Sequence, residues 1–388
     1  MLSREDNDTL TKVGKGTPGG ELLRRYWQPV AVATELTPEK PTKAVKILGE
    51  ELVLYRDKSG NYGLVGKHCP HRRAGLVYGR VEEDGIRCPY HGWKFNAAGK
   101  CLETPAEPRE SSLKDRVKQT AYPVEKLGGM LFAYLGPLPA PLLPRWDVLA
   151  WEKGRRTINI QSVLACNWLQ CMENSVDPSH LYWLHGASAH LAPRVGEYGE
   201  KHDFIQFEHG IMKRRTTPPK KAGGNPEIDQ HPLLFPNTLR HVSKDKKTGN
   251  IRHNLQFRIP IDDEHTQVYV VFFEPEVAER SPADGDVAFK PFPVRDDTGA
   301  YRLDQVLVQD AMAWETQGSV VDRSEEHLGS ADRGVAQYRK LIRDQIEVVR
   351  QGGDPLGTVR DPAKNRLIEF EVINERIGLV TPDRQAVA

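Results

Sequence analysis

The 388-residue sequence lacks several features that would define other classes of protein. No uninterrupted apolar run approaches the ~18 residues needed to span a bilayer, and the polar N-terminus has no apolar core of a signal peptide. Positive and negative charges are nearly balanced, with 54 lysine and arginine residues and 53 aspartate and glutamate residues. This balance gives no field that would favour nucleic acid or an anionic membrane. We therefore expect a cytoplasmic protein with neither kind of partner.

Cysteine is scarce, with five residues in the whole chain. An odd number in a long chain argues against a disulfide framework. Cys69 and Cys88 stand beside histidines at metal-ligand spacing. The other three are expected to be buried apolar thiols with no further role, namely Cys101, Cys166 and Cys171.

A convincing nucleotide-binding motif is also missing. Residues 14–19 formally satisfy the dinucleotide pattern G-x-G-x-x-G. They follow no predicted strand, however, and Pro18 stands where a helix should open, so the motif fails its structural context.

The N-terminal part of the chain has the pattern of a small all-β domain. Short runs rich in β-branched and aromatic residues are separated by glycine and aspartate turns, at residues 51–56, 62–66 and 130–135. Residues 136–147 contain four prolines, and such a stretch is a natural linker. We expect residues 1–138 to form one domain and residues 139–388 a second, catalytic domain.

Beyond the prolines, helices and strands occur in separate runs, which predicts an α+β domain. Strands are expected within residues 254–275, and residues 276–300 are expected to form a long surface loop. The first predicted helix is broken at Asp177-Pro178, because proline does not continue a helix. The predicted helices cover residues 161–186, 301–317 and 330–351.

The richest local motif places one cysteine and one histidine in each of two short loops. Cys69 and His71 are separated by one residue, Cys88 and His91 by two, and sixteen residues lie between the pairs. Two thiolates and two imidazoles are the ligands of a Rieske [2Fe–2S] cluster. Imidazole ligation raises the potential of such a cluster from ~−400 mV into the range ~−150 to +300 mV.

A structural zinc site is the alternative for the same four residues. Zinc sites usually pair cysteine with cysteine and histidine with histidine, whereas each loop here supplies one of each. This mixed pattern favours the Rieske cluster. His68 is not expected to be a ligand, and Trp93 is expected to pack over the cluster and limit the access of water.

A second group of polar residues has the skeleton Glu-x₃-Asp-x₂-His-x₄-His, from Glu173 to His185. His180 and His185 are five residues apart, about 140° on an ideal helix. They converge on one metal only if the helix ends or bends between them, and two ordinary helical histidines remain the alternative. Two histidines and one carboxylate with open positions are the ligand set of mononuclear Fe(II) oxygenases.

The third ligand must come from elsewhere in the chain. Asp310 lies within an otherwise half-apolar predicted helix, where a carboxylate normally needs a partner. Asp304 and Glu315 compete with it for this role. A simple surface ion pair of Asp310 is the alternative that involves no metal.

With these motifs, the chain resembles the oxygenase subunits of Rieske non-haem iron aromatic-ring-hydroxylating oxygenases. It is most similar to the group of phthalate 4,5-dioxygenase and 3-chlorobenzoate dioxygenase, which includes demethylating monooxygenases. The likeness is strong in the first 200 residues and returns near residues 260–266 and 309–310. It implies a Rieske β domain joined to a helix-grip domain, with an antiparallel sheet and helices.

The resemblance also implies roles for particular residues. Cys69, His71, Cys88 and His91 would hold the cluster, and His180, His185 and Asp310 would hold the iron. Asp177 would connect His180 to His91 of a neighbouring subunit in a homotrimer or larger oligomer, and Asn174 would lie near the iron. The activity implied is hydroxylation or demethylation of a small aromatic substrate with O₂. Since the chain has no convincing nucleotide-binding motif, the implied partner is a separate flavin or iron–sulfur reductase that brings electrons from NAD(P)H. A non-catalytic Rieske electron carrier is the alternative, in which the second set of residues has no function.

The substrate is expected to be an aromatic acid. The phthalate enzymes bind two carboxylates with arginines, and the matching stretch here contains Lys213, Arg214 and Arg215 in a different register. Any one of these three basic residues is a candidate to bind a single carboxylate, and a solvated basic strand end is the alternative for each of them.

Overall fold

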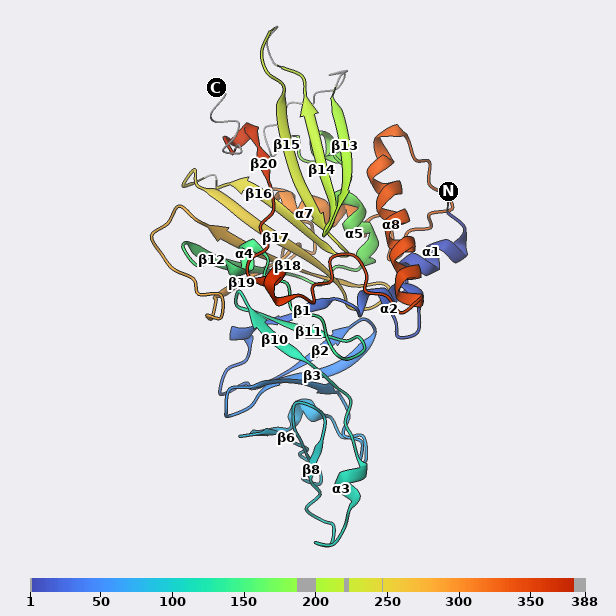
Figure 1. The fold of residues 1–388 in the computed structure, drawn as a ribbon, viewed down its shortest axis with the longest axis vertical. Coiled ribbons are helices and arrows are strands. Elements are labelled where there is room, and N and C mark those ends of the chain that lie inside the picture. Colours follow the sequence, from blue (N-terminus) through green and yellow to red (C-terminus); the bar gives the residue numbers. More distant parts are fainter. Residues whose placement is uncertain (1, 187–199, 220–222, 246, 380–388) are drawn as a thin grey trace.

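The computed structural model describes residues 2–186, 200–219, 223–245, 247–379. Figure 1 shows a long molecule with a large sheet and its helices at one end and small sheets at the other. None of the described helices is long and apolar enough to cross a membrane.

The narrow end of the molecule is built from three small antiparallel sheets. Glycine and aspartate turns allow their short strands to reverse direction, and apolar side chains such as Val53 and Val65 fill the space between them. The first sheet contains β1 (Trp27–Val32), β11 (Met130–Tyr134) and β10 (Val124–Leu127). The second contains β2 (Thr42–Ile47), β3 (Glu50–Arg56), β4 (Tyr62–Gly66) and β9 (Ala121–Tyr122). The third contains β5 (Arg80–Glu82), β6 (Gly85–Arg87), β7 (Lys94–Phe95) and β8 (Cys101–Glu103), and the short helix α3 (Leu113–Arg116) follows it in sequence.

The wide end contains one nine-stranded sheet. Its strands are antiparallel except for one parallel pair, β12 with β19. In spatial order the sheet runs β13 (Lys201–Phe207), β14 (Gly210–Thr217), β15 (Glu227–Leu234), β16 (Thr238–Lys244), β17 (Ile251–Pro260), β18 (Thr266–Glu274), β12 (Arg155–Gln161) and β19 (Phe289–Phe292), with β20 (Ile373–Asn374) beside β15.

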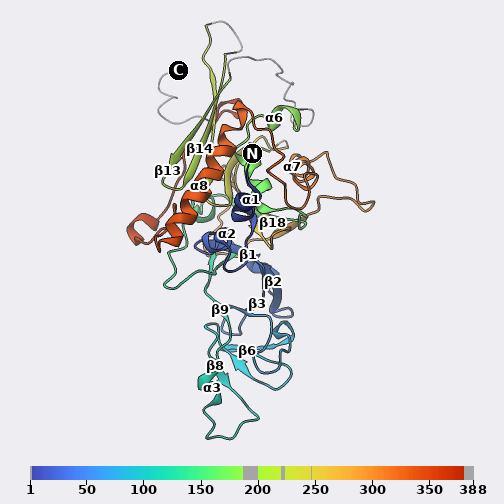
Figure 2. The same ribbon diagram turned by 90° about the vertical axis from the view of Figure 1, so that its right-hand side faces the viewer.

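Helices cover this sheet from two sides. Figure 2 shows α6 and α7 on one side of the molecule and α8 on the other. The N-terminal helices α1 and α2 contact α8, so the start of the chain supports the wide end. The helices are α1 (Arg4–Thr11), α2 (Pro18–Leu23), α4 (Asp147–Ala150), α5 (Trp168–Ser175), α6 (His180–Trp183), α7 (Val306–Glu315) and α8 (Arg333–Arg350).

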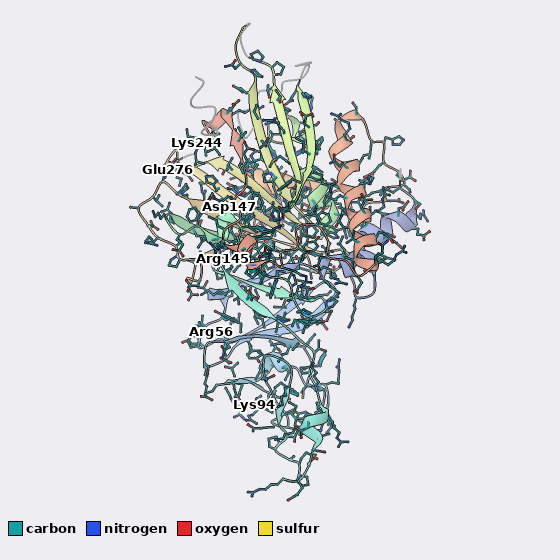
Figure 3. All side chains as sticks on the ribbon, in the orientation of Figure 1. Arg56, Lys94, Arg145, Asp147, Lys244 and Glu276 are labelled. Atoms are coloured by element: carbon teal, nitrogen blue, oxygen red, sulfur yellow. The ribbon has the colours of Figure 1, made fainter. Side chains whose placement is uncertain are left out.

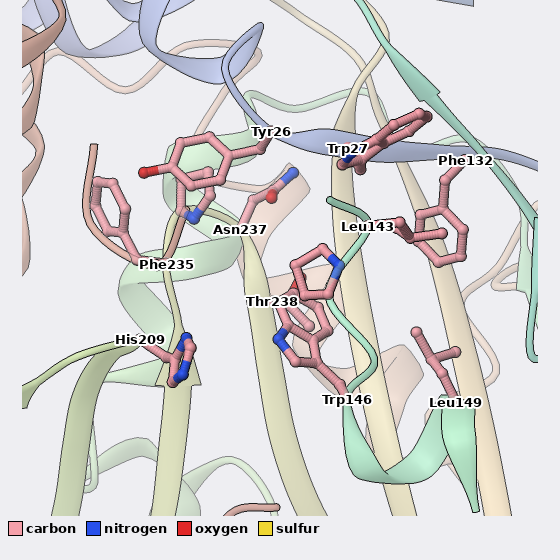
Figure 4. A pocket seen from close by; sticks show the side chains of 13 residues that line it. Tyr26, Trp27, Phe132, Leu143, Trp146, Leu149, His209, Phe235, Asn237 and Thr238 are labelled. Carbon is pink, nitrogen blue, oxygen red and sulfur yellow. The ribbon is translucent and has the colours of Figure 1, made fainter. Parts of the chain in front are cut away.

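The proline-rich connection is fastened to the large sheet. A buried ion pair joins Asp147, at the start of α4, to Arg240 on β16, with Nη2–Oδ2 at 3.0 Å. Figure 3 labels Asp147 near the middle of the molecule, far from Lys94 at the narrow end. A small aromatic pocket lies beside this connection, between Tyr26, Trp146 and Phe235 (Figure 4). Its volume of about 20 Å³ has room for about one water molecule, so it is no substrate site.

The expected fold class is confirmed, with a β-sheet N-terminal region and an antiparallel sheet with helices after it. The strands expected at residues 51–56, 62–66 and 130–135 are confirmed as β3, β4 and β11, and the pair expected within residues 254–275 as β17 and β18. The helix expected over residues 330–351 is confirmed as α8, preceded by a 3₁₀ turn.

Three expectations were wrong in detail. Helix α5 begins only at Trp168, because Asn167 caps it through a bond from the Leu169 backbone N–H to Oδ1 at 3.0 Å. Residues 276–300 are not all loop, since β19 pairs with β12. The argument from Pro18 also fails, because Thr17 caps α2 and Pro18 is its first residue, a favoured position for proline. The dinucleotide motif is still excluded, since helix α1 precedes it.

Candidate functional site: two metal centres and a cavity

The two Cys/His loops have the same backbone geometry. In each, the backbone N–H of the cysteine donates to the carbonyl five residues later, at 2.8 Å for Cys69 to Ala74 and 2.8 Å for Cys88 to Trp93. Each cysteine carbonyl in turn accepts from the residue four places on, from Arg73 at 2.9 Å and from Gly92 at 3.2 Å. The two loops therefore present their cysteines and histidines as a matched pair.

The matched geometry requires a left-handed residue at the same place in each loop. Arg73 has φ 64° and Gly92 has φ 73°. Glycine adopts this conformation without steric cost, whereas a residue with a Cβ is disfavoured there. A Cβ added at Gly92 would also lie 3.2 Å from Cγ of Pro105. Arg73 is thus a strained position that the loop tolerates.

The four side chains of these loops divide into an inner and an outer pair. Cys69 and Cys88 are buried, with exposed fractions of 1% and 2%, and burial raises the pKa of the Cys69 thiol to about 11. The imidazole rings of His71 and His91 lie nearer the surface, with their centroids 4.6 Å apart. One pair of thiolates and one pair of imidazoles on opposite sides suit a [2Fe–2S] cluster in which the histidines share one iron.

This arrangement argues against the zinc alternative. Zinc would need all four donor atoms around one point. Among the described residues, one group of three or more His, Cys, Asp or Glu side chains brings its donor atoms within 4.8 Å of one another. That group is His180, His185 and Asp310. The four residues of the loops are described and do not converge in this way.

Two further side chains, Trp93 and His68, contact the cluster loops. Trp93 is buried, and its ring stacks on His71 at 4.5 Å with an angle of 2° between the planes. It covers one side of the imidazole pair. Nδ1 of His68 lies 2.9 Å from the carbonyl oxygen of Arg73, so this ring supports the loop backbone.

The second metal centre is assembled from α6, the turn after it and α7. Helix α6 ends at Trp183, which lets His180 and His185 turn toward one point as their spacing requires. Nε2 of His185 lies 3.1 Å from Oδ1 of Asp310, and Nε2 of His180 lies 3.8 Å from the same oxygen. Two imidazole nitrogens and one carboxylate oxygen in this arrangement suit Fe(II) with open coordination positions.

Neighbouring side chains orient these three candidate ligands. Nδ1 of His185 lies 2.8 Å from Oε1 of Gln309, which directs Nε2 toward Asp310. Nδ2 of Asn174 donates to Oδ1 of Asp310 at 3.4 Å. Oδ2 of Asp177 lies 3.6 Å from Nδ1 of His180, and the other oxygen of Asp177 accepts from the Ser179 backbone N–H at 2.7 Å.

The two rival carboxylates are placed differently. Glu315 accepts from the Ala165 backbone N–H at 2.7 Å and from the Tyr301 hydroxyl at 2.7 Å, so it faces away from the histidines. Asp304 is exposed and accepts from Gln305. Neither joins the converging set, whereas one oxygen of Asp310 lies within 4 Å of both histidines.

Helix α5, which carries Asn174, is held by an ion-pair network that the sequence did not reveal. The guanidinium of Arg323 donates to both oxygens of Glu173, at 2.9 and 2.7 Å. Arg339 on α8 donates to Glu173 at 2.6 Å and also to Glu326. Nη1 of Arg323 reaches Oδ1 of Asn7 on α1 at 3.0 Å. Three distant segments, namely α1, residues 323–326 and α8, thereby fix α5 beside the metal centre.

The mononuclear centre opens into a cavity of about 600 Å³ between α5, α6, α7 and the large sheet. Of the three basic candidates on β14, Lys213 and Arg215 line this cavity and Arg214 does not. Arg215 is already paired with Asp229 and with Glu200. Within the described residues, the ammonium group of Lys213 has no hydrogen bond or ion pair. Burial lowers the pKa of Lys213 to about 8, although Asp229 opposes this shift.

Comparison with known families agrees with both parts of the chain. The Rieske [2Fe-2S] domain family matches residues 26–123, which contain both cluster loops. A family described as LigXa C-terminal domain like matches residues 297–378, which contain Asp310.

Whole-chain relatives extend this match. The chain is 42% identical to a 5,5'-dehydrodivanillate O-demethylase oxygenase subunit of Sphingobium sp. strain SYK-6, over 96% of this chain and 87% of the relative. It is 36% identical to a phenoxybenzoate dioxygenase subunit alpha of Ectopseudomonas oleovorans, over 90% and 86%. Phthalate and 3-chlorobenzoate dioxygenase subunits also match. The chain belongs to the oxygenase subunits of the Rieske non-haem iron oxygenases.

A solved structure supports the same fold. NdmA of Pseudomonas putida CBB5 superposes with a TM-score of 0.65 at 21% identity, covering 86% of this chain and 93% of NdmA. The expected cofactors of the family are therefore one [2Fe–2S] cluster and one mononuclear iron, and the donor sets described above fit both. The alternative of a pure electron carrier was wrong, because the relatives are catalytic oxygenase subunits.

Proposed function

We propose that this chain is the terminal oxygenase component that hydroxylates or demethylates an aromatic acid, with electrons from a separate NAD(P)H-dependent reductase. The observation that carries the proposal is the convergence of His180, His185 and Asp310 at the wall of a cavity of about 600 Å³. The relatives that are 42% and 36% identical to this chain act, by their names, on aromatic acids. In this proposal Cys69, His71, Cys88 and His91 hold the cluster within residues 1–138, and the iron is bound within residues 139–388.

Bound at these two sites, the cluster supplies single electrons and the iron supplies O₂ activation. The contribution of the protein is orientation and exclusion of water. Gln309 fixes the ring of His185, and Asn174 fixes the carboxylate of Asp310. Lys213 offers a half-buried cation to the carboxylate of the substrate, because it is the basic candidate in the cavity without an ion pair.

Asp177 is proposed to join two subunits. Figure 2 shows α6 near one end of the molecule and β6 near the other, so the two metal centres of one chain lie far apart. Asp177 is half-buried beside His180, and its side chain is 27% exposed. In a ring of three copies this carboxylate would accept a hydrogen bond from His91 of the next subunit, and the two centres would become neighbours. Activity in the cytoplasm remains a prediction from the sequence.

Metal analysis and isotope labelling test this proposal. The purified chain should contain about three irons and two sulfides, and Asp310→Ala should lose one iron while the visible absorption of the cluster survives. Asp304→Ala, a second carboxylate at the same cavity, is the matched control and should keep all three. Incubation with reductase, ¹⁸O₂ and a panel of aromatic acids and aryl methyl ethers should give an ¹⁸O-labelled product. A chain that holds all its iron but oxygenates none of these compounds would contradict the proposed function.

A further inference from the structure

Helix α6 holds one of the three candidate iron ligands but has little support of its own. It spans four residues, His180–Trp183, and within the described chain the side chain of Ser179 makes no capping hydrogen bond to it. A helix of one turn is not stable alone in water, because fixing the first turn costs more free energy than its hydrogen bond returns. The position of His180 therefore depends on contacts between α6 and the rest of the protein.

Tyr182, two residues after His180, makes several such contacts. Its hydroxyl donates to Oε1 of Glu200 at 2.7 Å and accepts from Nη2 of Arg376 at 3.0 Å. The guanidinium carbons of Arg215 and Arg376 lie 5.4 and 5.8 Å from the centre of its ring, within the range of cation–π attraction. Tyr182 thus fastens α6 to β14, to the residue before β13 and to the C-terminal part of the described chain.

The pairing of β20 with β15 brings Arg376 to this helix. Register places Asn374 opposite Asp229, and Arg376 lies in the 3₁₀ turn that follows, Glu375–Ile377. The Ile228 backbone N–H donates to a carboxylate oxygen on the first residue of this turn at 2.6 Å. The contact between Arg376 and α6 is therefore built on the large sheet.

The same contacts lead to the basic side of the cavity. Arg215 pairs with Glu200, with Nε–Oε1 at 3.2 Å, and it also pairs with Asp229. Oδ1 of Asp229 lies 2.8 Å from Nδ1 of His231, which stands opposite Lys213 in the strand register. A series of polar contacts thus runs from Lys213, the candidate carboxylate site, to Glu200, which accepts from the tyrosine hydroxyl.

A carboxylate bound to Lys213 would act along this series. The charge of Asp229 acts both on Lys213 and on Arg215. A bound carboxylate competes with Asp229 for the ammonium group, so Asp229 depends more on Arg215, and the pair between Arg215 and Glu200 weakens. Burial opposes ionisation of Glu200, but bonds from its neighbours, Tyr182 among them, keep its pKa below the ordinary value. Glu200 therefore stays charged and depends more on the hydroxyl of Tyr182.

We infer that Tyr182 is a positioning residue that sets the orientation of His180 at the iron according to whether a carboxylate occupies Lys213. This inference rests on the proposed function, which supplies both the carboxylate site and the iron site. Among the described residues, Tyr182 lies outside the lining of the cavity and outside the set of converging donor atoms. It acts through α6 and does not contact the substrate.

Nitric oxide binding to the iron tests the inference without turnover. Titration of the metal-loaded chain with nitric oxide, with and without saturating benzoate, gives two dissociation constants, and their ratio measures the coupling between the two sites. We expect benzoate to change the dissociation constant by about fivefold or more in the parent protein. In Tyr182→Phe, which keeps the ring but loses the hydroxyl, the change should be less than about twofold. The electron paramagnetic resonance signal of the nitrosyl complex should likewise respond to benzoate in the parent and not in this variant.

Tyr26→Phe is the matched control. It also removes a hydroxyl that donates a hydrogen bond, to the Leu356 carbonyl at 2.8 Å, but it lies outside the contacts of α6. This control should couple benzoate and nitric oxide as the parent does. Iron content and cluster absorption would verify that each variant is folded.

Glu200→Gln is a second, independent variant. It keeps an acceptor for the Tyr182 hydroxyl but removes the charge that pairs with Arg215. It should also weaken the coupling, and the double variant with Tyr182→Phe should lose no more than the stronger of the two, because both changes interrupt one series of contacts. Should Tyr182→Phe fail to hold iron, Glu200→Gln decides by the same comparison.

Three results would overturn the inference. They are unchanged coupling in Tyr182→Phe and Glu200→Gln, effects of these two changes that simply add, and a parent protein that does not respond to benzoate. In each case ¹⁸O-labelled product from an aromatic acid would leave the proposed function standing. Absence of product from every compound, with both metals bound, would instead show that the proposed function itself is wrong.

Discussion

Replacement of Lys213 by methionine should stabilise the protein. The side chains are similar in length, but methionine carries no charge into the cavity. Burial holds the pKa of Lys213 at about 8 in place of 10.5, and one pKa unit corresponds to 1.36 kcal/mol. The folded state therefore bears a cost of roughly 3 kcal/mol at pH 7, where the lysine is charged in both the folded and the unfolded chain.

The pH dependence gives the sign of this effect. The folded protein binds the proton on Lys213 less tightly than the unfolded chain does. Below about pH 8 the charged lysine therefore lowers the free energy of unfolding by its full amount. This effect disappears as the pH rises from about 8 to 10.5, because the folded protein loses the proton first. Lys213→Met should thus be more stable than the parent by roughly 3 kcal/mol at pH 7, and the two should be nearly equal by the upper end of that range.

Urea denaturation at matched metal content, at pH 7 and pH 10, would measure this difference in free energy of unfolding. Lys201→Met, on the neighbouring strand β13, is the matched control because its side chain is 71% exposed, and its effect should stay within about 0.5 kcal/mol. The same Lys213 variant should lose affinity for aromatic acids, which is the common exchange of stability for function. A Lys213→Met variant that is equally or less stable at pH 7, or a difference that does not shrink with pH, would refute the reasoning.

Four further substitutions probe the two metal centres and the connection between the two ends of the molecule. Asp177→Asn should leave both metals bound but abolish turnover coupled to the reductase, measured by product formed per NAD(P)H consumed; normal coupling would contradict the bridging role. Gly92→Val should lose the cluster absorption near neutral pH, since φ 73° and Pro105 oppose a branched side chain, whereas Arg73→Gly should keep it and gain about 1 kcal/mol. Asp147→Ala should lower stability by about 3–5 kcal/mol in denaturant titrations, because Arg240 is left buried without its partner; a loss below about 1 kcal/mol would show that the pair is not important.

The cluster loops could be predicted from the sequence because all four residues lie in two short segments. The mononuclear centre was harder, since Asp310 is 125 positions from His185 and only tertiary structure brings them together. The roles of Gln309 and Glu173 could not be predicted from the sequence. No neighbouring residue in the sequence indicates that Gln309 contacts His185, or that Glu173 pairs with two arginines. The choice of Lys213 over Arg214 follows from strand alternation once β14 is known, since adjacent residues of a strand point to opposite faces.

Strand β17 shows why the cavity itself was missed. Its residues alternate between polar and apolar, with Asn254, Gln256 and Arg258 polar and Leu255 and Phe257 apolar. Such alternation is typical of a strand with one face in solvent, yet all five residues are buried. The helices that cover the polar face do not fill it, and Arg258 donates to Gln256, which donates to Asn254. A half-polar strand with both faces buried therefore marks the floor of a binding cavity. The donors and acceptors on its polar face indicate which hydrogen-bonding groups the ligand must carry.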